Sequence, residues 1–119
     1  MKWLSDMFPS ILNLRIAESS QEGKVAIISL KDREYNIVNI VDDLLAIYNA
    51  LELHDPTLIF YRFYFIFKDT ISTDTSTEMK VVAVKTDDLL QYKEHKIDFN
   101  ALETQIEVSD IKLRQQTDA

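Results

Sequence analysis

Apolar and polar positions near the start of the chain predict a short helix followed by a β-hairpin. Residues 3–8 place their apolar side chains on one side of a helical turn that Pro9 ends, where they can cover a core. Alternating apolar and polar residues then indicate a half-buried strand, followed by a turn around Gly23 and a second strand that is apolar on both sides. The pattern predicts a hairpin over residues 11–30.

Residues 35–53 fit two interpretations. A helix that Asp55 and Pro56 stop is predicted by apolar residues at steps of four and three, namely Ile37, Val41, Leu44, Tyr48 and Leu51. Several residues at 37–41 are β-branched, however, and favour a third strand at 35–41, with Asp42 capping a shorter helix. Both interpretations keep a helix over residues 43–53.

The most apolar stretch of the chain is residues 58–67, in which Arg62 is the single polar side chain among ten. As a strand, it would carry five of its side chains on each face. One face would hold Ile59, Tyr61, Phe63, Phe65 and Phe67, and the other would hold Leu58, Phe60, Arg62, Tyr64 and Ile66. Burying nine such side chains contributes about 15–25 kcal/mol gross, so we expect both faces to be covered. The cover comes either from helices on both sides or from helices on one side and another molecule on the other.

Arg62 bears on the choice between these two kinds of cover. A buried unpaired charge costs several kcal/mol, so the guanidinium must reach solvent or find a carboxylate within the chain. Arginine among aromatic residues is also typical of interface hot spots. The predicted interface consists of Phe60, Arg62, Tyr64 and Ile66, with a twofold homodimer as the simplest assembly.

The second half of the chain predicts a loop rich in Ser and Thr at 69–78, a strand at 79–85 and two helices. Thr86 is the expected cap of the first helix, with Asp87 and Asp88 at the favourable end of its dipole, and the second begins at Asp98.

These elements make one α+β domain over residues 1–111, with an antiparallel sheet of four or five strands packed with short helices. Residues 112–119 are expected to be a frayed polar tail. In its order of elements (helix, strands, helix, two strands, helix) this small acidic chain is similar to the dimeric chaperones of secreted bacterial effectors.

The net charge of −7 is placed entirely after residue 40. Such an acidic chain is a poor candidate for direct nucleic-acid binding, because neutralising phosphates supplies most of that affinity. The candidate acidic surface consists of Asp42, Asp43, Asp87 and Asp88. It is interpreted either as a solvated surface or as a mimic of nucleic acid.

Other classes are excluded or disfavoured by composition. The chain has no cysteine, which removes disulfide scaffolds and thiolate chemistry, and its single glycine removes the glycine-rich phosphate loops. No apolar run is long enough for a signal peptide or membrane span, so we expect a cytoplasmic protein without membrane contact. His54 and His95 are interpreted as surface residues, and we expect no metal site and no cofactor.

The leading hypothesis is a non-catalytic protein-binding module: a small acidic adaptor, chaperone or inhibitor that acts through an aromatic sheet face and an acidic surface. An acidic inhibitor would lose affinity as salt rises, whereas a hydrophobic chaperone would not. The alternative is a small enzyme with scattered Asp, Glu or His residues in a pocket between sheet and helices.

Overall fold

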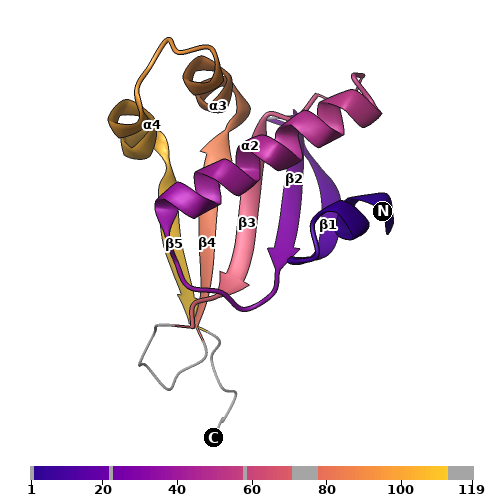
Figure 1. The fold of residues 1–119 in the computed structure, drawn as a ribbon, viewed down its shortest axis with the longest axis vertical. Coiled ribbons are helices and arrows are strands. Elements are labelled where there is room, and N and C mark those ends of the chain that lie inside the picture. Colours follow the sequence, from indigo (N-terminus) through magenta and orange to yellow (C-terminus); the bar gives the residue numbers. More distant parts are fainter. Residues whose placement is uncertain (1, 22, 58, 71–77, 113–119) are drawn as a thin grey trace, which may run out of the picture.

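The computed structural model describes residues 2–21, 23–57, 59–70 and 78–112 (Figure 1). In chain order, the elements are α1 (Lys2–Met7), β1 (Ile11–Ser19), β2 (Gly23–Leu30), α2 (Ile37–His54), β3 (Arg62–Lys68), β4 (Glu78–Lys85), α3 (Thr86–Lys93), α4 (Phe99–Gln105) and β5 (Glu107–Lys112). The predicted α+β class is confirmed. Most of the predicted Ser/Thr-rich loop, residues 71–77, and most of the predicted tail, residues 113–119, lie outside the described residues.

The N-terminal hairpin forms as predicted. β1 and β2 pair antiparallel, and the turn between them closes at Gly23, whose φ of 91° is a conformation that side chains with a Cβ rarely adopt. α1 precedes the hairpin and ends at Met7, just before Pro9. Its Leu4 is fully buried in the core.

The five strands lie in the order β1-β2-β3-β4-β5, and all neighbours pair antiparallel except β2 and β3, which are parallel. The parallel pair departs from the predicted antiparallel sheet. The two strands are parallel because α2, which follows β2 and precedes β3 along the chain, returns the chain to the end of the sheet where β2 began. β5 supplies the fifth strand, and it runs to Lys112, one residue into the predicted tail.

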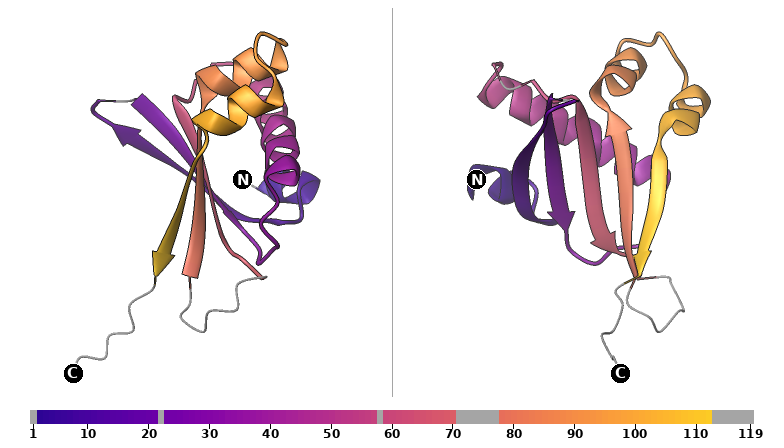
Figure 2. Two further views of the ribbon diagram at one scale, coloured as in Figure 1. Left: turned by 90° about the vertical axis from the view of Figure 1, so that its left-hand side faces the viewer. Right: turned by 180° about the vertical axis from the view of Figure 1, so that it is seen from behind.

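The four helices of the described chain lie on one side of this sheet or beyond one of its ends (Figure 2). α2 crosses the face of the sheet, and α1 lies near its β1 edge (Figure 1). α3 and α4 follow at the end where β4 finishes. The opposite face, seen from behind in Figure 2, is crossed by no helix of the described chain. Among these helices, none has both the length and the apolar character needed to span a bilayer.

The hydrophobic core fills the space between α2 and the covered face of the sheet. β3 contributes Phe63, Phe65 and Phe67. Phe63 registers with Ala26 of β2 and Val84 of β4, and Phe65 registers with Ile28 of β2 and Val82 of β4. The short helices add one fully buried leucine each: Leu4, Leu89 and Leu102. A single apolar layer therefore holds the domain together.

β3 begins later than the apolar stretch predicts, at Arg62 rather than near residue 58. The residues before it do not alternate across the sheet. Phe60 lies in the core, with its ring centroid 5.4 Å from that of Phe63, instead of joining Arg62, Tyr64 and Ile66. Ile59, which strand alternation would place on the same face as Phe63 and Phe65, is 77% exposed.

Residues 37–54 are helical, so the predicted third strand at 35–41 is wrong. Asn36 rather than Asp42 caps the helix, and its side chain accepts hydrogen bonds from the backbone amides of Val38 and Asn39 at 3.1 and 3.2 Å. The β-branched Ile40 and Val41 are buried against the sheet at helical spacing with Leu44. Tertiary burial thus outweighs their preference for strands.

The predicted cap at Thr86 and the predicted helix start at Asp98 have different outcomes. Asp98 caps α4, with its carboxylate accepting from the Ala101 amide at 2.8 Å. Thr86 does not cap α3, because it is already the first helical residue and Lys85 occupies the cap position without a capping side-chain hydrogen bond. Asp87 and Asp88 do lie in the first turn of α3, as predicted.

Candidate functional site

The face of the sheet opposite the helices is the main candidate site, and we call it the open face. Its members follow from the register, because paired residues of neighbouring strands point to the same side. The central side chains of the open face, from β2, β3 and β4, are Val25, Ile27, Tyr64, Ile66, Val81 and Ala83.

The centre of the open face is apolar. Val25 and Ala83 are buried, and Ile27, Tyr64 and Ile66 are half-buried. A sheet with one face in water normally alternates apolar and polar residues along its strands, and these three strands do not. The sequence does carry a signal for this apolar face, because residues 24–30 and 79–85 also lack alternation. These two segments form the strands on either side of β3, but the predicted interface did not include them.

Arg62 lies on the open face near one end of β3. Its guanidinium Nη1 lies 3.2 Å from Glu107 Oε1, and its Cζ lies 5.5 Å from the centroid of the Tyr61 ring. The Arg62 side chain is 14% exposed, and that of Glu107 is 67% exposed. The expectation that this arginine finds a carboxylate is therefore met within the chain, by a bond that joins β3 to β5 across β4.

The four predicted acidic residues lie on two helices rather than on the open face. Asp42 and Asp43 belong to α2, where Asp43 Oδ2 accepts a hydrogen bond from Arg33 Nη1 at 2.7 Å. Asp87 and Asp88 lie in the first turn of α3. These four carboxylates and the open face therefore occupy different parts of the molecule.

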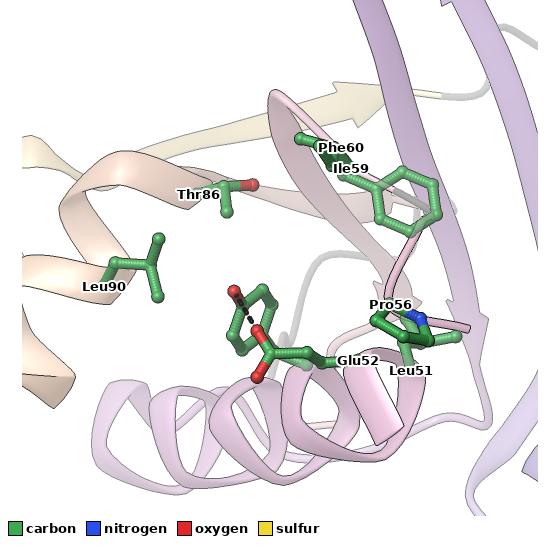
Figure 3. A pocket seen from close by; sticks show the side chains of 8 residues that line it. Leu51, Glu52, Pro56, Ile59, Phe60, Thr86 and Leu90 are labelled. Atoms are coloured by element: carbon green, nitrogen blue, oxygen red, sulfur yellow. Dashed lines mark hydrogen bonds between the residues drawn. The ribbon is translucent and has the colours of Figure 1, made fainter. Parts of the chain in front are cut away.

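A pocket of about 110 Å³ lies between α2, α3 and the segment before β3 (Figure 3). Apolar side chains, including Leu51, Phe60 and Leu90, form much of its wall. Its polar groups are Glu52 and Tyr48 of α2 and the Thr86 hydroxyl, which has no hydrogen-bond partner among the described residues. The Thr86 Oγ1 atom is buried, so the groups that can orient a small polar ligand are the Tyr48 hydroxyl and the Glu52 carboxylate.

Tyr48 and Glu52 form the one hydrogen-bonded pair of side chains drawn in this pocket (Figure 3), with the phenol donating to the Glu52 carboxylate at 2.8 Å. Burial, followed by the bond to Glu52 and its negative charge, raises the pKa of Tyr48 from 10.0 to about 12. The phenol therefore keeps its proton at neutral pH and acts as a donor, not as a base or nucleophile.

We expect one tyrosine to ionise near pH 12 when phenolate absorbance is followed during alkaline titration, and Tyr48→Phe should remove this step. A raised pKa means that the folded state favours the protonated phenol. Its contribution to stability is therefore complete below pH 10 and lost as pH rises from 10 towards 12. Glu52→Gln should shift the step to lower pH, because the charge is removed while burial remains.

An unchanged late step in Tyr48→Phe would contradict this assignment. It would leave Tyr35, whose pKa burial also raises, as the source.

Neither histidine lines this pocket. The His54 ring stacks on that of Trp3, with centroids 4.1 Å apart, so the end of α2 is packed against α1. His95 lies in the turn after α3, with a φ of 61°. Within the described ranges, no group of three or more His, Asp or Glu side chains is placed to hold a metal ion. The pocket thus adds no catalytic histidine or metal centre to the enzyme hypothesis.

No protein-family model matches this chain, and neither a curated protein nor a solved structure is significantly similar to it, so its function has to be inferred from its own residues.

Proposed function

We propose that this chain is a non-catalytic protein-binding module, in the manner of a small adaptor, chaperone or inhibitor, and that the open face receives its partner. The observation that carries the proposal is the one-sided placement of the helices. Apolar side chains of three adjacent strands face away from every helix of the described chain.

The chemistry of the open face favours a protein as the partner. Ile27, Ile66 and Val81 are aliphatic and gain free energy by leaving water, at about 25 cal/mol for each Å² that a partner covers. A nucleic acid would instead need stacking platforms, and among the described residues at the centre of this face only Tyr64 offers a ring. Contiguous apolar surface on a small domain is a common mark of a protein interface.

Photo-crosslinking tests the proposal directly. A benzophenone amino acid at position 64 should attach to a partner protein in cells, whereas the same group at the exposed Leu53 of α2 should not. The captured protein is then purified and titrated against the wild-type chain and against Ile66→Glu, which places a charge at the centre of the open face.

We expect Ile66→Glu to weaken this binding by at least about tenfold, because a desolvated unpaired carboxylate costs several kcal/mol. Circular dichroism and thermal unfolding must show that the variant keeps its fold. Equal affinity of folded Ile66→Glu and wild type would overturn the proposal, as would equal crosslinking from positions 64 and 53. The sequence names a second copy of the chain as the simplest partner, and the mass of the adduct tests it.

A further inference from the structure

The open face carries charge of the opposite sign to the chain as a whole. Register and alternation place four basic side chains there: Arg15 of β1, Arg62 and Lys68 of β3, and Lys85 of β4. Glu107 of β5 is the one acidic side chain that the described pairing puts on the same side. Because the whole chain has a net charge of −7, its acidic excess lies elsewhere, with Asp42, Asp43, Asp87 and Asp88 on the helices.

The basic residues surround the apolar centre instead of interrupting it. Arg62 and Lys85 are paired near one end of β3, Lys68 ends the same strand, and Arg15 lies towards the β1 edge. Arg15, Lys68 and Lys85 are exposed, and none forms an ion pair with another described side chain. An apolar centre with a basic rim is complementary to a partner whose apolar stripe is flanked by carboxylates.

We propose that the partner presents an acidic amphipathic helix to the open face, an inference that rests on the proposed function and names the chemistry of the partner. A helix can pack on the face of a sheet, as α2 does on the other side, whereas a single extended segment would pair at an edge. From Arg62 to Lys68 the strand rises about 20 Å. A helix of about 14 residues spans that length.

This charge pattern disfavours the homodimer that the sequence alone suggests. In a twofold dimer through the open face, each copy would present the same patch to the other. The four basic groups would then be doubled against two carboxylates, and like charges at an interface oppose association.

The first test uses two designed helical peptides of equal length, each with a leucine stripe. The stripe is flanked by glutamates in one peptide and by lysines in the other. We expect the glutamate peptide to bind the wild-type chain at least about tenfold more tightly, with affinity falling as NaCl is raised from about 20 to about 300 mM, because salt screens exposed charges. Equal binding of the two peptides would overturn the inference.

The second test compares two triple variants that lose the same charge. Arg15→Gln, Lys68→Gln and Lys85→Gln together neutralise exposed groups of the open face. The control combines Lys24→Gln, Lys31→Gln and Lys96→Gln, which are exposed elsewhere. We expect the first set to lower the affinity for the glutamate peptide by about tenfold at low salt, which corresponds to the loss of three exposed ion pairs. The affinity of the control for the same peptide should stay within about twofold of wild type. Equal effects of the two sets would assign the salt dependence to net charge and overturn the inference.

Three further outcomes test this inference separately from the proposed function. Ile66→Glu abolishes binding of the crosslinked partner in the first outcome, while salt and the triple variant of Arg15, Lys68 and Lys85 leave that binding unchanged. The open face would then bind protein, but its partner would not be acidic. A wild-type dimer that Ile66→Glu converts to a folded monomer would show a second copy on the face and also overturn the inference. So would tighter binding of single-stranded oligothymidine than of the glutamate peptide.

Discussion

Phe65→Ala is expected to lower the free energy of unfolding by about 3–5 kcal/mol, the usual cost of removing a buried phenylalanine ring. Phe65 is 1% exposed and registers with Ile28 on one side and Val82 on the other, so the cavity left behind has little room to collapse. Domains of this size are stable by about 5–15 kcal/mol, so the loss is a large share of the total. Denaturant unfolding followed by circular dichroism measures it.

The matched control is the next residue along the strand. Ile66 points to the open face and is half-buried. Because no helix of the described chain crosses that face and the side chain is only half-buried, Ile66→Ala should cost at most about half as much as Phe65→Ala. If both variants lost the same free energy in the monomer, the second face of the sheet would be covered as well, and the account of a one-sided core would be wrong.

Leu4→Ala should have the second-largest effect, about 2–5 kcal/mol. α1 has only six residues and cannot persist on its own, so it depends on the packing of its apolar side. Leu4 is fully buried, whereas Met7 at the end of the same helix is 59% exposed. Met7→Ala should therefore change stability by no more than about 0.5 kcal/mol.

The comparison of these two variants tests whether the N-terminal helix belongs to the cooperative fold. A loss from Leu4→Ala as small as that from Met7→Ala would mean that α1 lies loosely on the hairpin. In that case the Trp3–His54 ring contact would not hold the end of α2 either.

Several elements of the fold could be predicted because their signals are local. The hairpin over residues 11–30 follows from alternation and from one glycine. The last helix was predicted to begin at Asp98, and Asp98 is its cap, an interaction that involves only the next three residues. The α+β class followed from the order of such elements. Whether residues 35–41 were helix or strand could not be decided in this way, because β-branched residues favour a strand and only the burial of Ile40 and Val41 under the sheet settles them as helix.

The candidate site was less accessible to sequence. Alternation within one strand placed Arg62, Tyr64 and Ile66 on the same side, and the structure agrees. It misplaced Phe60, since a strand that begins at Arg62 leaves the preceding residues free to turn into the core. The partner of Arg62 could not be predicted either, because Glu107 is 45 residues away along the chain.

The sequence by itself determined which segments are apolar, where the chain turns, and that Arg62 needs a carboxylate or water. Only the tertiary structure decided that no helix of the described residues crosses one face of the sheet, and that Arg15 and Lys85 share that face with Arg62 and Lys68. The physical reason is that apolar patterning reports how much surface a segment must bury. Which element covers it, and which strands lie side by side, depends on pairing between residues far apart in the chain.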